Sequence, residues 1–120
     1  MISRVAESCC SPHDVMESDW KQFRDMAPKL RERYLTEKNA RIVALLTDPK
    51  KTETERFWDA LEVMEREAKV LHNCLDGYSR SSMQMYMLRM IGVGMLRKAD
   101  MAAFSEELQR HVSFAFDDRM

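Results

Sequence analysis

The segment from Met83 to Leu96 constrains the fold of this chain more than any other, because it is apolar almost all the way round. It reads MQMYMLRMIGVGML, with five methionines and only Gln84 and Arg89 strongly polar. A surface helix normally keeps one solvated face, and this segment has almost none. We therefore expect either the central helix of a small helical domain or a helix partly covered by a second protein chain. Methionine suits both, because its side chain is unbranched and polarizable.

The length and the scarcity of helix breakers then define the fold class. A chain of 120 residues is the size of one ordinary domain, and its three glycines and three prolines leave long uninterrupted runs. We predict an all-α fold, a small up-and-down bundle of four to five helices joined by short loops. The expected organisation is a flexible leader over residues 1–12, one bundle domain over residues 13–115 and a frayed tail over residues 116–120.

The first helical region is predicted from near His13 to Leu46. Its apolar residues recur at alternating steps of three and four, the spacing of one helix face: Trp20, Phe23, Ala27, Leu30 and Tyr34. Pro28 lies inside this run, removes one backbone donor and crowds the preceding turn. We therefore expect the first helix to be kinked or broken near Pro28.

The second helical region has the clearest start signal in the chain. Thr52, followed three residues later by Glu55, forms the pattern of a capping box. The apolar residues that follow keep a seven-residue repeat: Phe57, Leu61, Met64, Ala68, Leu71 and Leu75. Such a repeat indicates nearly parallel or antiparallel helix packing. We expect this seam to pack antiparallel against the first region, with Arg31 close to Glu65.

The remaining helices should enclose the methionine-rich segment. Met87, Met90 and Ile91 share one face of the least polar helix, and we expect them to be the most buried stretch of the chain. A last helix is predicted to start between Arg97 and Asp100 and to run to about Phe114. Its expected inner face comprises Phe104, Leu108 and either His111 or Val112.

Motifs for metal binding and catalysis are weak. Cys9, Cys10 and His13 form one cluster of metal-ligating types, but adjacent cysteines do not readily turn toward one ion. His72 and Cys74 lie about 200° apart on a helix. The sequence contains neither a G-x-S-x-G elbow nor a Gly-x-Gly-x-x-Gly loop. We therefore predict a protein without metal or cofactor that is not an enzyme; an enzyme whose site the motifs do not reveal is the third hypothesis.

Charge is nearly balanced overall but alternates along the chain. The net charge of −1 excludes a strongly basic nucleic-acid binder. Residues 19–51 have a net charge of +4 and residues 52–79 a net charge of −4, so neighbouring antiparallel helices can pair complementary flanks. Arg24, Arg31 and Lys38, spaced by seven, form a basic edge on the first region. That edge supports the alternative function, association with a nucleic acid, and it would also steer an acidic partner protein.

Several large apolar residues lie off the simplest helix seams. We predict a contact surface for a second copy of the chain or for a partner protein, drawing on Trp58, Met85, Tyr86 and Met95. The function that this pattern favours is non-enzymatic protein binding by a small regulatory, adaptor or inhibitor protein, through helix-in-groove recognition.

The expected location is the cytoplasm. The first residues lack the apolar run of a secretory signal, and no segment reaches the length of a membrane span. The three cysteines are too few and too oddly placed for a disulfide framework, which fits a reducing compartment. We therefore expect a soluble protein that does not associate with a membrane.

Overall fold

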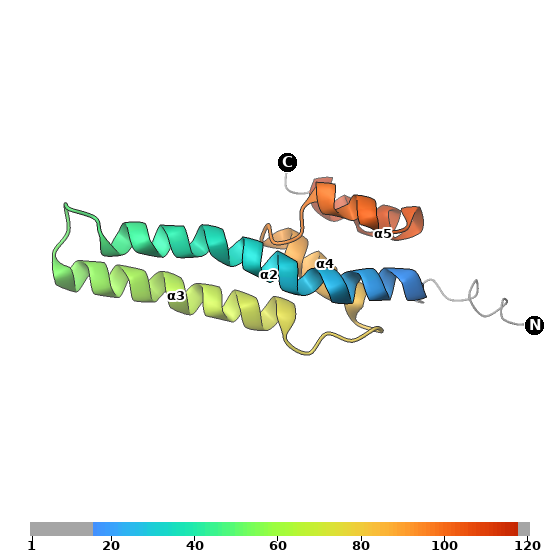
Figure 1. Cartoon of the computed structure of the whole chain (residues 1–120), viewed down its shortest axis with the longest axis horizontal. Helices are drawn as coiled ribbons and strands as arrows, with labels where there is room; N and C mark the ends of the chain where they lie inside the picture. The colour runs from blue at the N-terminus through green and yellow to red at the C-terminus, as the bar shows by residue number, and fades with distance from the viewer. Residues whose placement is uncertain (1–15, 118–120) are drawn as a thin grey trace, which may run out of the picture.

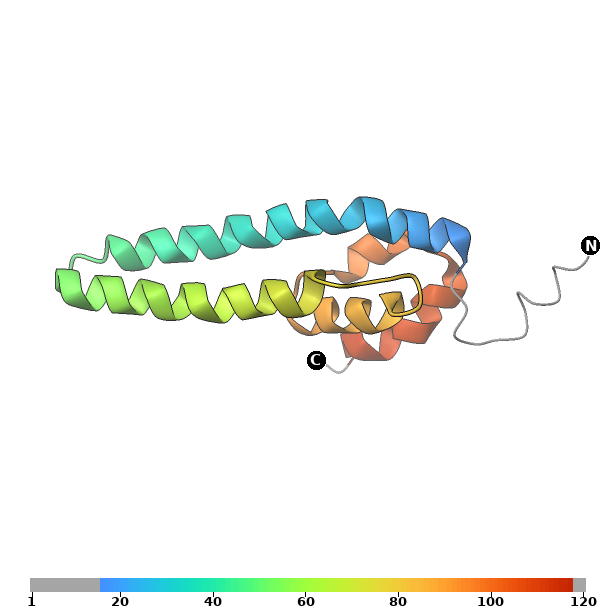
Figure 2. The same ribbon diagram turned by 90° about the horizontal axis from the view of Figure 1, so that it is seen from below.

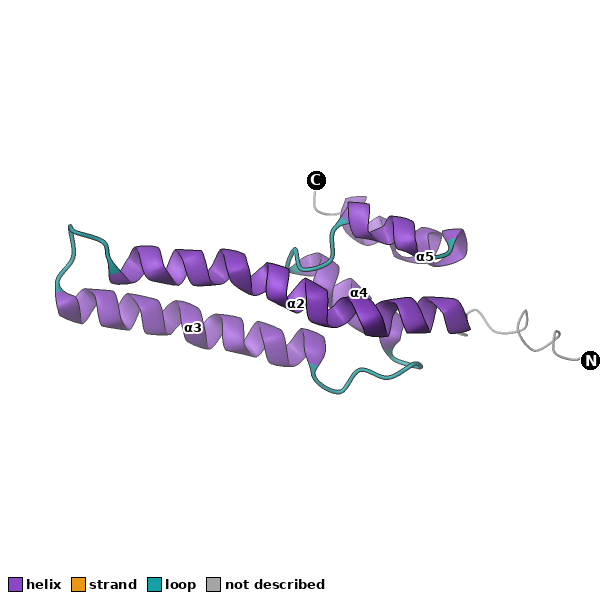
Figure 3. Ribbon diagram, viewed as in Figure 1, coloured by secondary structure: helices purple, strands orange, loops and turns teal. Residues whose placement is uncertain are grey.

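The computed structural model describes residues 16–117, and this part of the chain is built from helices alone (Figure 1, Figure 3). The elements in chain order are α2 (Glu17–Leu46), α3 (Glu53–Leu75), α4 (Met83–Gly92), the 3₁₀ helix η1 (Lys98–Ala103) and α5 (Glu106–Asp117). The predicted all-α bundle of four to five helices is confirmed. The predicted leader, the helix start near His13 and the last three residues of the predicted tail lie outside the described residues.

The long helices α2 and α3 form an antiparallel hairpin, and the other three helices pack against only one end of it (Figure 1, Figure 2). The molecule is accordingly elongated, with principal extents of 68 × 28 × 18 Å. We call residues 38–67 the distal hairpin, because α4, η1 and α5 do not reach them. None of the described helices combines the length and apolar composition needed to cross a lipid bilayer.

Helix α2 runs through Pro28 without interruption for 30 residues. The predicted disturbance therefore takes the form of a curved helix and not of a break (Figure 2). The helix can continue because Pro28 is exposed, so water can solvate the carbonyl of the preceding turn that loses its hydrogen bond there. The predicted inner face of this helix is confirmed, since four of its five residues are at most 5% exposed: Phe23, Ala27, Leu30 and Tyr34.

Helix α3 begins as predicted but turns a different face to α2. The Thr52 backbone N–H donates to Glu55 Oε1 (2.9 Å), and the Glu55 N–H donates to Thr52 Oγ1 (3.1 Å), which completes the capping box. The buried residues of α3 are Ala60, Val63, Glu67 and Cys74. Each precedes a residue of the predicted seam by one position, and one position rotates a helix by about 100°. The predicted inward seam was therefore wrong along the distal part of α3.

The rotation of α3 has an identifiable cause in a polar contact between the helices. The Tyr34 hydroxyl donates to the Glu67 carboxylate, and Lys38 Nζ lies 3.9 Å from the same carboxylate. This contact needs Glu67 inside the hairpin, and Glu65 is consequently exposed. The predicted pair of Arg31 with Glu65 was wrong for that reason; Arg31 instead pairs with its neighbour Glu32 at 3.2 Å.

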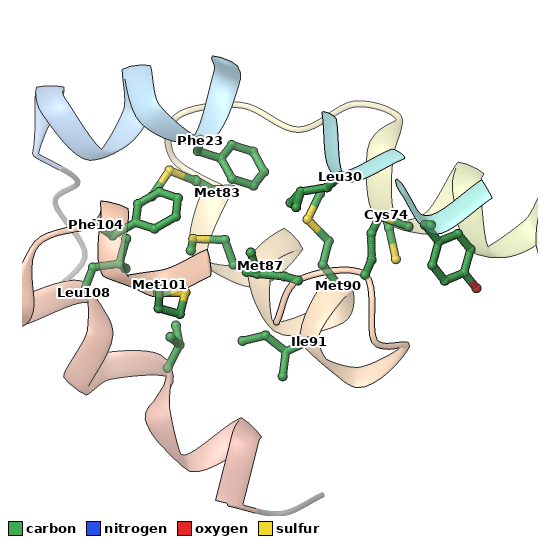
Figure 4. Packing of buried hydrophobic residues seen from close by; sticks show 14 residues of the cluster. Phe23, Leu30, Cys74, Met83, Met87, Met90, Ile91, Met101, Phe104 and Leu108 are labelled. Carbon is green, nitrogen blue, oxygen red and sulfur yellow. The ribbon is translucent and has the colours of Figure 1, made fainter. Parts of the chain in front are cut away.

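The methionines of α4 form the centre of the packed end (Figure 4). Met83, Met87 and Met90 are 0% exposed and Ile91 is 1% exposed, which confirms the predicted burial. We call this cluster, with the residues packed on it from α2, α3, η1 and α5, the proximal core.

Helix α4 ends at Gly92, as expected from Gly92 and Gly94, which weaken and terminate a helix inside the apolar segment. Gly94 adopts a φ of +82°, and the Met95 N–H donates to the Met90 carbonyl at 2.8 Å while the Gly94 N–H donates to the Ile91 carbonyl at 3.1 Å. These are the two hydrogen bonds of a Schellman motif, which brings the residue after the glycine onto the last turn of the helix. Met95 is accordingly only 1% exposed.

The C-terminal region is divided into two helices where one was predicted. Residues 98–103 form η1, and α5 then extends to Asp117, beyond the expected end near Phe114. The Ser105 hydroxyl accepts from the Leu108 N–H (3.2 Å) at the start of α5 and donates to Asp19 Oδ2 (2.6 Å). The predicted inner face is confirmed, with Val112 chosen over the half-buried His111: Phe104, Leu108 and Val112.

An ion pair connects α2 to η1. Arg33 donates to both carboxylate oxygens of Asp100, at 3.0 and 2.7 Å, and to the Met95 carbonyl at 2.9 Å. The hydrogen bond from Arg33 lowers the pKa of Asp100, burial opposes this, and a bond from the Arg97 N–H adds to the lowering. This network fixes the position of η1 on the hairpin.

Candidate protein-binding surface

The distal hairpin concentrates large apolar side chains that are exposed to solvent. Among the described residues nine large hydrophobic side chains are exposed, and five of them lie on the distal hairpin, with exposed fractions of 46–59%. These five are Val43, Leu46, Phe57, Trp58 and Met64. This concentration is unusual, because the distal hairpin contributes fewer than a third of the described residues.

Most of these side chains lie on one side of the hairpin, as helix geometry shows. Val43 follows the half-buried Ile42, and Met64 follows the buried Val63, each by one position. One position turns both helices by about 100° in the same rotational sense. In an antiparallel pair, that turn takes the residues of both helices to the same side. The same one-position offset from an inward residue applies to Leu46, Phe57 and Leu61.

The cross-hairpin contacts set which residues are level with one another. Glu67 is in contact with Tyr34 and Lys38, and near the loop Arg56 Nε donates to the Asp48 carbonyl at 2.9 Å. Counting from these contacts toward the loop places Leu46 near the level of Phe57 and Val43 near that of Leu61. The result is one continuous apolar strip, which we call the hairpin face: Val43, Leu46, Phe57, Leu61 and Met64.

The interior of the distal hairpin mixes small apolar and polar residues, and its buried members are Ala60, Val63 and Glu67. The half-buried inward positions likewise include charged as well as apolar residues: Lys38, Ile42, Leu45 and Arg56. Burial raises the pKa of Tyr34, and its hydrogen bond to the Glu67 carboxylate raises it further. The Lys38 ammonium lies 5.0 Å from the centre of the Tyr34 ring, a distance that allows a cation–π contact. The largest apolar side chains of this part of the molecule are on the outside: Phe57, Trp58 and Met64.

The structure does not bring the four predicted contact residues together. Trp58 is 59% exposed on the distal hairpin, with its ring edge-on to Phe57 at 5.0 Å, whereas Met85 is 47% exposed on α4 at the other end. Tyr86 is half-buried and donates to the Asp76 carbonyl at 2.6 Å. The exposure expected for Met95 was wrong, because the Schellman motif turns it into the proximal core.

Sequence reasoning missed the rest of the hairpin face, although a signal for it existed. The stripe containing Phe57, Leu61 and Met64 was identified as a helix seam but was assigned to the contact with α2. A second stripe with the same spacing starts one residue earlier, at Arg56. Two parallel stripes indicate a helix with contacts on two sides. The outer stripe packs on the proximal core at Leu71 and Leu75, whereas its distal part has no such contact among the described residues.

The predicted basic edge is partly neutralised. The Arg24 guanidinium lies 5.6 Å from the centre of the Trp20 ring, and Arg31 has Glu32 as an acidic partner. Lys38 is turned toward Glu67 inside the hairpin. The three side chains therefore do not combine into one exposed cationic strip.

The buried carboxylate of the proximal end, Asp19, is hydrogen-bonded within the chain. Asp19 accepts from both the backbone N–H and the hydroxyl of Ser105, at 2.9 and 2.6 Å, so this carboxylate is satisfied. The cavity beside them, which His111 also lines, measures only about 20 Å³. In the part of the chain that the structure describes, no group of three or more His, Cys, Asp or Glu side chains could hold a metal ion.

Comparison of the chain with protein-family models, with curated proteins and with solved structures finds no match. The geometry of the chain itself is therefore the basis for a functional proposal.

Proposed function

We propose that this chain is a non-enzymatic protein-binding module, of the adaptor or regulatory kind, and that its partner contacts the hairpin face. The observation that carries this proposal is the strip of large apolar side chains on the outside of a hairpin whose buried residues are Ala60, Val63 and Glu67. The partner surface that fits such a strip is another long helix, because the seven-residue spacing suits nearly parallel packing.

The size of the strip supports the same function. A fully exposed large aromatic side chain presents about 150–250 Å², and burial energies of aliphatic side chains correspond to about 60–120 Å² each. At half exposure, the four exposed residues of the strip and the flanking Trp58 together present roughly 350 Å² of apolar surface. The largest apolar patch of a typical monomer covers about 300–600 Å² and is often functional.

The proposal includes a cytoplasmic location. It also places the contact on the hairpin face and not on the four residues predicted from the sequence. Cys74, the buried cysteine of the described residues, is a free thiol, which fits a reducing compartment. Trp58 remains in the proposed surface as a flank of the hairpin face, whereas Met85 and Tyr86 do not belong to it. Association with a nucleic acid is not favoured, because Arg31 and Lys38 already have acidic neighbours.

Photo-crosslinking tests the proposal with a matched control. The photoreactive residue p-benzoylphenylalanine replaces Phe57 in one variant and Phe114 in another, two phenylalanines with exposed fractions of 56% and 54%. Irradiation of cells that naturally produce the protein should join position 57, and not position 114, to a second polypeptide. An absence of adducts at position 57, or equal adducts at both positions, would remove the support for the proposal.

A further inference from the structure

We infer that the hairpin face is covered by the hairpin face of a second copy of this chain, so that two hairpins form a four-helix bundle. This inference rests on the proposed function, because it names the partner of the same surface. It also specifies the arrangement: both hairpin tips point the same way, and α2 of each copy lies against α3 of the other.

The absence of charge on the hairpin face makes it compatible with itself. All five of its residues are apolar, and the α3 stripe continues through the exposed Ala68. Charged residues of the distal hairpin lie elsewhere; for example, Lys51 pairs with Asp59 at 2.5 Å. Two identical faces can therefore meet without opposing like charges at their centre, a condition that a symmetric contact must satisfy.

The charges beside the hairpin face select one of two symmetric arrangements. On α3 the exposed Glu62 and Glu65 each follow a residue of the hairpin face by one position, whereas the corresponding positions of α2 hold Ala44 and Thr47. The α3 flank of the face is thus acidic and the α2 flank uncharged. A two-fold axis parallel to the helices places α2 opposite the partner's α3, so the two acidic flanks stay apart. An axis across the helices would place α3 on α3, where like charges meet.

The proximal end does not block this contact. Leu30 faces the proximal core, and Leu46 lies on the hairpin face. They are 16 positions apart, which separates them by about 160° around the α2 axis. Helices α4, η1 and α5 therefore lie on the far side of the hairpin, and two copies can approach with both proximal ends at the same end of the dimer.

The available surface provides most of the apolar area that a dimer contact requires. A stable interface buries about 800 Å² per partner, of which roughly 60% is non-polar, or about 480 Å². Four residues of the hairpin face and the flanking Trp58 supply roughly 350 Å² of this. The half-buried Leu61 and the exposed Ala68 extend the same strip.

The oligomeric state of the full chain tests the inference. Sedimentation equilibrium should give the wild-type chain twice its mass of 14.1 kDa at micromolar concentrations. The double variant Phe57→Glu/Met64→Glu should sediment as a monomer with unchanged helical circular dichroism. The control Phe114→Glu/Met85→Glu changes two side chains of similar exposure, 54% and 47%, and should remain dimeric.

A distance measurement on the unaltered face tests the arrangement and does not depend on the folding of those variants. Nitroxide labels are attached at Lys50→Cys, near the tip, with Cys9 and Cys10 replaced by serine. Tips at the same end should be within about 20 Å of each other, given helix spacings of 8–10 Å. In the opposite arrangement each tip lies about ten residues from the middle of the face, which separates the labels by roughly 30 Å.

Each outcome has a distinct meaning. A wild-type chain that stays monomeric at its highest soluble concentration overturns the second copy as the occupant; adducts at position 57 with a different protein would then still support the proposed function. A dimer that survives Phe57→Glu/Met64→Glu forms through another surface and also overturns the second copy as the occupant of the hairpin face; crosslinking at position 57 then decides the proposed function separately. A dimer with widely separated labels overturns the arrangement with tips together.

Discussion

The two ends of the α2–α3 hairpin use large apolar residues in opposite ways. At the proximal end Met83, Met87 and Met90 of α4 are fully buried. In the distal hairpin the buried apolar residues are the small Ala60 and Val63, while Met64 is 52% exposed. The same residue type is therefore core at one end and surface at the other.

This difference shows that the distal hairpin buries little apolar surface of its own, and that part of its interior is polar. A buried carboxylate costs free energy unless it is hydrogen-bonded and paired, and Tyr34 and Lys38 supply those contacts to Glu67. Such polar contacts fix the register and rotation of two helices better than they stabilise them. The rotation that they impose turns the apolar stripe of α3 outward, where a partner can use it.

The strongest test of this comparison replaces one methionine at each end by alanine. Met90→Ala should lower the free energy of unfolding by about 2–5 kcal/mol, the range for truncating a buried large apolar residue. Met64→Ala should change it by no more than about 0.5 kcal/mol, the range for surface positions. Urea denaturation followed by circular dichroism, in dilute protein to suppress association, measures both. Equal losses at the two sites would contradict the contrast between the ends.

The next largest effect should come from the ion pair at the proximal end. Asp100→Asn removes the charged acceptor of Arg33 and should lower stability at pH 7 by about 1–3 kcal/mol. The pKa of Asp100 is lower in the folded chain than the unfolded value near 3.9. The stabilisation that ionised Asp100 contributes to the folded chain is therefore complete above about pH 4. It is lost as the pH falls through the folded-state pKa. Denaturation curves of both proteins should converge in acid; a constant difference down to pH 2 would refute this role.

A smaller effect is expected at the hairpin tip. Thr52→Ala removes the side-chain half of the capping box and should cost about 1 kcal/mol. If the tip opens separately from the proximal core, amide hydrogen exchange in the first turns of α3 should accelerate about fivefold while the α4 amides keep their rates. Uniform acceleration in both helices would show instead that the two ends unfold as one unit.

The smallest effect should follow Arg31→Ala. This side chain is exposed, and its partner Glu32 is its sequence neighbour, so stability should change by less than about 0.5 kcal/mol. Thermal denaturation at low and high salt gives the measurement. A loss above 1 kcal/mol that salt removes would indicate a cross-helix ion pair with α3, as the sequence had suggested.

The features that the sequence predicted correctly are those determined by local spacing. The inner face of α2, the capping box of α3 and the burial of Met90 all depend on residues within one helix or its first turn. The Schellman motif after α4 is also readable in principle, since Gly94 is followed directly by an apolar residue. Recognising it would have placed Met95 in the core and removed it from the contact surface.

The rotation of α3 could not be predicted in the same way. Its two stripes, which begin at Arg56 and Phe57, have identical spacing, and the second is the more apolar. The choice between them depends on where the Tyr34 hydroxyl and Lys38 meet Glu67, a contact between residues about 30 positions apart. Helical periodicity contains no information on such a contact, and the candidate binding surface was missed because of it.

Cys74 lies where the hairpin meets the proximal core, and its thiol can report how often that end of the molecule opens. Its side chain is 1% exposed, and burial raises the pKa of its thiol. A protonated, enclosed thiol does not attack a disulfide reagent, so modification has to wait until the helices around it separate. The rate of its labelling therefore reports how often the proximal core opens in the native protein, and a ligand that holds the hairpin closed would slow that rate.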